Sequence, residues 1–222
     1  MEAQRFVSEE VIPRLRGTLH THAAWVAGLL AATLIVLAPT GEARVAAGIY
    51  GIGLVALFTV SATYHRWPGD PRWKPWLQRL DHSTIFVFIA ASYTPVALLM
   101  LQPPMRTVVL VSVWVGAAAG VALSLAWISA PRYLVAGCYL AVGWVAVIAL
   151  PQLWREIGAA PFVLLAVGGG LYSLGAAVYA IRKPNLWPRT FGFHEVFHTL
   201  VIAAALVHFI AMAAWVVPHA TG

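Results

Sequence analysis

Long apolar runs, separated by short breaks rich in proline, glycine and charged residues, dominate the sequence. Each run has about 20 residues, which is the length that an α-helix needs to cross the hydrocarbon core of a bilayer. Backbone polar groups inside lipid must bond within their own segment, so each run is predicted to be a helix. The seven runs are 18–38, 44–65, 80–101, 106–128, 132–151, 160–181 and 193–216.

The short connections predict that these helices pack as one bundle. We therefore expect an all-α membrane protein, a seven-transmembrane helix bundle, with a cytoplasmic tail at 1–17 and a transmembrane domain at 18–217. Lysine and arginine predict its orientation. Eleven of the fourteen lie in the tail or in the second, fourth and sixth connections, and only Arg44, Arg106 and Arg155 lie on the opposite side. Basic residues concentrate in cytoplasmic loops, which predicts a cytoplasmic N-terminus and an external C-terminus.

Composition excludes several classes of protein. Hydrophobic residues make up 61% of the chain and charged residues 10%, which is not the composition of a soluble globular domain. The net charge of +6 is accounted for by orientation and by contact with anionic lipid, so nucleic-acid binding is not expected. The single cysteine, Cys138, excludes a disulfide framework and a thiol-rich metal site.

Ionisable residues gather at the predicted cytoplasmic ends of the spans, although such groups are costly in a membrane and usually face its protein interior. The residues that share this depth are His20, His22, His65, Asp81, His82, His194 and His198. His208 follows His194 by fourteen residues, about 21 Å along a helix axis, so we expect it to make an interhelical hydrogen bond instead. The run Gly168–Gly170 is expected to allow close helix packing.

The string H-E-x-x-H at 194–198 raises the question of zinc. His194 and His198 share one helical face and can bind one tetrahedral zinc ion. His65 can supply a third nitrogen and leave one position open, as in catalytic sites. Ser61 lies one turn deeper than His65, so its hydroxyl could contact a metal-bound water. Asp81 could orient that water and accept its proton.

Simpler interpretations of the same residues are open at this point. His20, His22 and His82 could contact lipid headgroups at the membrane surface. Asp81 could be the N-cap of the third span, because aspartate before an apolar helix commonly accepts a hydrogen bond from the first turn. Ser61 by itself could be a small residue that packs between helices.

Four segments resemble the hemolysin III family, which belongs with the progestin and adipoQ receptors and, more distantly, the alkaline ceramidases. They are S-A-T-Y-H (61–65), L-D-H-S-T-I-F (80–86), S-Y-T-P (92–95) and F-G-F-H-E-V-F-H (191–198). The resemblance covers nearly the whole chain and implies seven spans with the N-terminus inside. It implies a zinc site made by His65, His194 and His198, with Asp81 and Ser61 around the metal-bound water. The receptor relatives are regarded as ceramide-hydrolysing.

One departure from the family concerns the first span. Members commonly open it with an asparagine-containing segment before a histidine, whereas this chain has R-L-R-G-T-L-H at 14–20. The departure argues against a contribution of the first span, His20 included. No acidic residue follows His198, whereas an intramembrane protease with H-E-x-x-H needs a later aspartate. Glu195 is therefore interpreted as a neighbour whose spacing mimics the protease signature.

Three functions are compatible with these residues. The first is a zinc-dependent hydrolase of a ceramide-like lipid amide, with Asp81 as general base and a role in membrane homeostasis. The second is a zinc-stabilised sensor or receptor of membrane state. The third, a pore-forming cytolysin, is disfavoured because the polar groups cluster at one end of the bundle. We expect a multi-pass protein of the bacterial plasma membrane, with the bilayer and a membrane lipid as its partners.

Overall fold

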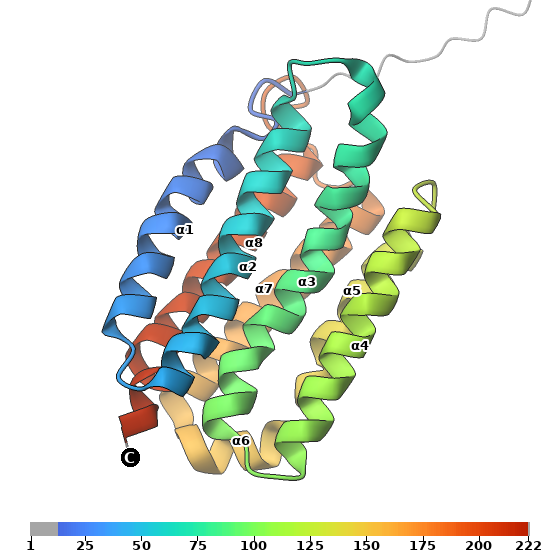
Figure 1. Ribbon diagram of the computed structural model, residues 1–222. Coiled ribbons are helices and arrows are strands. Elements are labelled where there is room, and N and C mark those ends of the chain that lie inside the picture. The colour runs from blue at the N-terminus through green and yellow to red at the C-terminus, as the bar shows by residue number, and fades with distance from the viewer. Residues whose placement is uncertain (1–12, 222) are drawn as a thin grey trace, which may run out of the picture.

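The computed structural model describes residues 13–221 and shows a bundle of helices that lie side by side (Figure 1). The helices are α1 (Thr18–Leu37), α2 (Gly41–Arg66), α3 (Lys74–Met100), α4 (Met105–Ala126), α5 (Arg132–Gly143), α6 (Leu150–Ile157), α7 (Ala159–Ile181) and α8 (Phe193–Ala211). Shorter elements are the 3-10 helices Pro71–Trp73, Trp144–Ala149 and Pro218–Thr221 and the π-helical turn Met212–Val216. Among the described residues, extended pairing is limited to the bridge between Trp187 and Phe191.

Seven spans of this structure are long and apolar enough to cross a membrane, which confirms the predicted fold class. The protein is a multi-pass integral membrane protein. Two boundaries differ by six residues from those read from the apolar runs, and the others agree within about three. The third helix begins at Lys74 rather than 80, because Pro75 in its first turn favours a helix start that precedes the apolar residues. The fifth span continues to Ile157 rather than 151 and ends at Gly158, whose φ is 71°.

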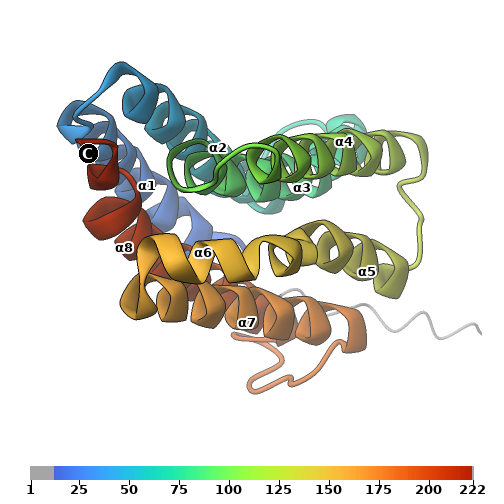
Figure 2. The same cartoon turned by 90° about the horizontal axis from the view of Figure 1, so that it is seen from below.

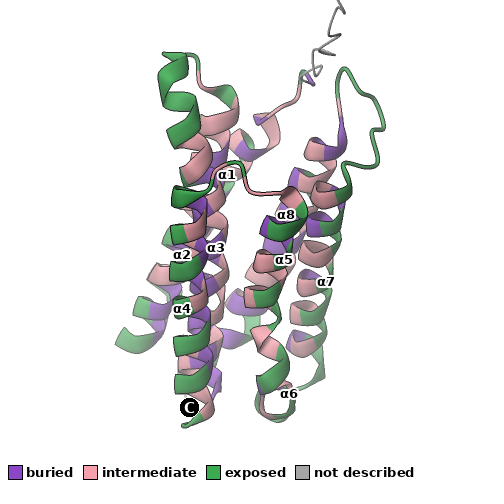
Figure 3. Cartoon of the chain, turned by 90° about the vertical axis from the view of Figure 1, so that its right-hand side faces the viewer, coloured by how far each residue is buried: buried purple, intermediate pink, exposed green. Residues whose placement is uncertain are grey.

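Helices that are neighbours in sequence are also neighbours in space, and α8 returns to contact α1 (Figure 2). Buried residues face the centre of the bundle, and exposed residues face outward (Figure 3). Large apolar side chains such as Trp25 and Leu29 are among the exposed ones. An apolar exterior is expected for helices in lipid, because lipid tails are as apolar as the side chains themselves.

The fifth span is interrupted, whereas its apolar run predicted one continuous helix. α5 ends at Gly143, and a 3-10 helix leads into α6. The Tyr93 hydroxyl of α3 donates to the carbonyl of Gly143 and accepts from the amide of Ala146 at 2.9 Å. Irregular backbone at membrane depth is tolerated only where the protein satisfies it or where it lines a cavity. Both conditions hold, because Gly143 and Ala146 also line the interior cavity described below.

Close packing joins α7 to α8. His208 Nε2 donates to the Leu165 carbonyl at 3.1 Å, so the predicted interhelical hydrogen bond is confirmed. A Cβ atom added at Gly168 would lie 2.1 Å from Cδ2 of His208, which confirms the packing role of this glycine. Gly169 and Gly170 differ, because an added Cβ atom would meet nothing within 4 Å and both residues line the cavity.

The orientation of the bundle in the membrane stays a prediction from the distribution of basic residues. We expect a reporter that is active only in the cytoplasm to be active at the N-terminus and inactive at the C-terminus. The measurement is reporter activity of the two fusions, normalised to their expression. A high signal from the C-terminal fusion would contradict the orientation and would place the histidine-rich end outside.

Candidate metal centre

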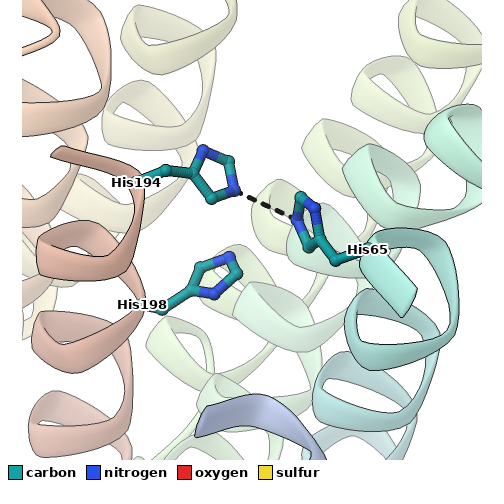
Figure 4. A group of neighbouring side chains, drawn as sticks. All are labelled: His65, His194 and His198. Atoms are coloured by element: carbon teal, nitrogen blue, oxygen red, sulfur yellow. Dashed lines mark hydrogen bonds between the residues drawn. The ribbon is translucent and has the colours of Figure 1, made fainter. Parts of the chain in front are cut away.

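Three histidine side chains converge between α2 and α8 (Figure 4). His194 and His198 project from the first two turns of α8 toward His65, near the end of α2. One ring nitrogen of each lies within 4.8 Å of the others, and Nε2 of His65 and Nε2 of His194 are 3.0 Å apart. Nitrogen ligands about 2.0–2.1 Å from a tetrahedral zinc ion lie about 3.3 Å from one another. The three imidazoles therefore fit a zinc ion with small adjustments.

The first turn of α8 is held in place by side chains. The amide of Phe193 donates to Oδ1 of Asn185 at 2.9 Å, and the amide of Gly192 donates to Oε2 of Glu195 at 2.8 Å. These bonds satisfy amide groups that a helix start otherwise leaves without partners. They fix the direction in which α8 begins, and therefore the direction in which His194 and His198 project.

Glu195, the glutamate of H-E-x-x-H, is fully buried and has both oxygens engaged. Oε2 receives the Gly192 amide, and Oε1 lies 2.6 Å from Nε of Arg16 in an ion pair. The carboxylate thus joins the start of α8 to the segment that precedes α1. This geometry favours a structural role for Glu195 over that of a zincin-type base.

The segment 13–17 covers the end of α2 that carries His65. Backbone amides of Arg14 and Leu15 donate to the carbonyls of residues 189 and 190 in the loop before α8. Gly17 has a φ of 76°, and a Cβ atom added to it would lie 2.7 Å from Cβ of His65. Of the tail predicted at 1–17, these residues pack against the bundle, whereas residues 1–12 lie outside the described part of the chain.

Asp81 and Ser61 lie beside the three histidines. Oδ2 of Asp81 is 4.0 Å from Nε2 of His65. Ser61 is buried, and it lines the same end of the interior cavity as Asp81. The interpretation of Asp81 as the N-cap of the third span is wrong, because α3 begins seven residues earlier, at Lys74. The carboxylate points instead toward the interior, where it lines the cavity.

The sequence pattern favoured a headgroup contact for His20 and argued against a contribution of the first span, but the His20 side chain belongs to this group. It is 2% exposed, and its ring stacks on that of His198 with centroids 3.8 Å apart. The headgroup interpretation is therefore wrong for His20, while His22 is exposed and remains a candidate for such a contact. His82 is half-buried and lines the cavity. The depth that His20 shares with His65 and His198 was the available signal.

An interior cavity of about 380 Å³ opens beside these residues. Its polar end is formed by His20, Ser61, Asp81, His82, His194 and His198. On α8 and the turn after it, the lining residues run from His194 to Met212, a distance of about 27 Å along the helix axis. Beyond the polar end, the cavity is lined mainly by apolar side chains such as Phe88, Val96 and Leu165.

The fold and the site define a class: a seven-helix membrane protein with a three-histidine cluster at one end of an interior cavity. The chain belongs to the haemolysin-III related family, whose family model matches residues 10–209. The resemblance seen in the four motifs is thereby confirmed.

Relatives in bacteria and animals extend this result. The chain is 29% identical to "Hemolysin-3" of Bacillus cereus over 184 residues, which cover 82% of this chain and 80% of the relative. It is 30% identical to the "Hemolysin-3 homolog" of Bacillus subtilis, with 72% of each chain covered. It is 28% identical to the human "Monocyte to macrophage differentiation factor", with coverage of 76% and 69%. No solved structure matches the chain. The seven spans and the bacterial relatives indicate a protein of the bacterial plasma membrane.

Proposed function

We propose that this protein is a zinc-dependent hydrolase that cleaves the amide bond of a ceramide-like membrane lipid. One observation carries the proposal: three imidazole nitrogens within 4.8 Å of one another lie beside a buried carboxylate at the end of an apolar cavity. Three histidine ligands leave a fourth position for water or substrate, which is the pattern of catalytic rather than structural zinc sites.

Zinc bound there would lower the pKa of a water molecule to about 7 and polarise the carbonyl of the substrate. The protein's own residues supply the remaining steps. Asp81 accepts a proton from the attacking water as a new bond forms between the oxygen of that water and the carbonyl carbon of the substrate. The C–N bond then breaks, and Asp81 returns the proton to the leaving amine nitrogen. The products are a fatty acid and an amine. The Ser61 hydroxyl, which lines the same end of the cavity, would orient the Asp81 carboxylate by donating a hydrogen bond to it.

The cavity supports a lipid as the substrate. Its volume of about 380 Å³ lies within the range of ligand pockets, about 300–1,000 Å³. An acyl chain suits its apolar length, and the polar end then faces the linkage between chain and headgroup. The choice of an amide rests on the resemblance to ceramide-hydrolysing relatives.

A second candidate function is a sensor of membrane state, in which a structural zinc ion bound by residues of α2 and α8 would hold the two helices together. It is favoured by the short distance of 4.0 Å between Asp81 Oδ2 and His65 Nε2, because a carboxylate this close could serve as a fourth ligand and close the site. Zinc would then contribute folding energy rather than chemistry.

The test is lipid-amide hydrolysis by purified protein in nanodiscs that contain a ceramide-like lipid. We expect release of free fatty acid, loss of release after treatment with a zinc chelator, and recovery when Zn²⁺ is added back. Fatty acid is measured by mass spectrometry, and zinc is measured in the same samples. Zinc-loaded, folded protein that leaves every lipid amide intact would favour the sensor.

A further inference from the structure

Ser61 differs in its hydrogen bonds from seven other hydroxyl residues of the spans. A serine or threonine in a helix commonly donates to the carbonyl four residues earlier. The residues that do so here are Thr21, Thr33, Thr63, Thr94, Ser124, Ser173 and Thr199. Ser61 instead bonds to the side chain of His20 on α1, and it lines the cavity together with Asp81 of α3. A partner on another helix therefore competes with the helix backbone for the Ser61 hydroxyl.

That partner is His20. Its Nδ1 lies 2.9 Å from Oγ of Ser61, and both residues are buried. The ring is itself fixed, since it stacks on His198 with an angle of 17° between the planes and meets Phe58 edge-on at 5.0 Å. A buried ring held on two sides offers Nδ1 in one position, so the Ser61 hydroxyl has one favoured direction.

We propose that His20 is a positioning residue of the metal centre that performs two separable tasks. Through Nδ1 it orients the Ser61 hydroxyl toward Asp81. Through its ring face it stacks on the zinc-ligand candidate His198 and fixes the orientation of that ring. The assignment of the first task to the reaction rests on the proposed hydrolase function. The second concerns metal affinity and holds for a sensor as well. Outer partners of this kind typically change metal affinity or activity by about 10–100-fold.

Two substitutions separate the tasks. In His20→Asn, the amide group takes the place of Nδ1, so Ser61 keeps a partner, but the stacking ring is lost. In His20→Phe, the ring face is kept and the hydrogen-bonding nitrogen is removed. We expect His20→Asn to keep most of kcat and to lose about 10-fold in zinc affinity, and His20→Phe to keep the affinity and to lose about 10-fold or more in kcat with KM little changed. His22→Ala, in the same helix but exposed, is the matched control.

A double-mutant cycle tests whether His20 acts through Ser61. If it does, His20→Phe combined with Ser61→Ala lowers kcat no further than Ser61→Ala alone. The same cycle is read from the visible absorption spectrum of the Co²⁺-substituted protein, which needs no turnover. In that spectrum we expect His20→Phe and Ser61→Ala to shift the bands alike. Zinc affinity is measured by competition with a chelator.

The outcomes discriminate between the proposals. Additive losses in the double mutant, or a His20→Phe protein with unchanged kcat and spectrum, would overturn the link from His20 to Ser61. Equal zinc affinity in His20→Asn and the unmutated protein would overturn the role of the ring. A non-additive spectral cycle in a protein without amidase activity would retain the positioning role and remove the hydrolase function.

Discussion

Asp81→Asn is expected to retain most of the bound zinc and to lose about 10²-fold or more in the rate of lipid-amide hydrolysis. Zinc is retained because His65, His194 and His198 remain, and the rate falls because asparagine cannot accept the proton of the attacking water. General bases typically contribute about 10²–10⁴-fold. The measurement is fatty-acid release in nanodiscs, with zinc content determined on the same preparations.

Glu195→Gln provides the contrasting variant. Glutamine can still accept the Gly192 amide at the start of α8, but its ion pair with Arg16 is lost. We expect a less stable protein whose rate per bound zinc falls far less than in Asp81→Asn. Thermal unfolding of both variants separates stability from catalysis. An inactive Glu195→Gln protein that keeps zinc, next to an active Asp81→Asn protein, would show that Glu195 is the base and would reverse our assignment.

Alanine substitution of His65, His194 or His198 is expected to remove most of the zinc. The unmutated protein should bind about one zinc ion per chain, because three imidazoles leave one open position in a four-coordinate site. Loss of one of three ligands leaves too few to hold the ion against a chelator. Metal content is measured by plasma mass spectrometry on protein that elutes as a single peak in size-exclusion chromatography.

His22→Ala and His219→Ala are the controls for these ligand variants, because both histidines are exposed in the structure. They should keep the zinc content of the unmutated protein. His65→Ala is the most informative ligand variant, since His65 is the only member of the trio on α2. Full zinc content in His65→Ala would refute the ligand set.

The sequence alone determined the number and nature of the helices. Seven apolar runs became seven spans, because the length of a run and the need to satisfy its backbone in lipid are local properties. The sequence also indicated which residues share one depth, since position along a helix follows from counting at about 1.5 Å per residue. That count placed His65, His194 and His198 at one depth together with four other ionisable residues, and the four motifs led to the family and to the ligand set that it implies.

Only the tertiary structure decided which side chains meet. Glu195 and Arg16 are 179 positions apart, and His20 and Ser61 are 41 apart, so no local pattern predicts either contact. These contacts depend on the rotation of each helix about its own axis. Hydrophobicity does not reveal that rotation in a membrane protein, because lipid and helix interior are similarly apolar. The break in the fifth span could not be predicted from its apolar run either. Tyr93, which lies on another helix, forms the hydrogen bonds that the interrupted backbone needs.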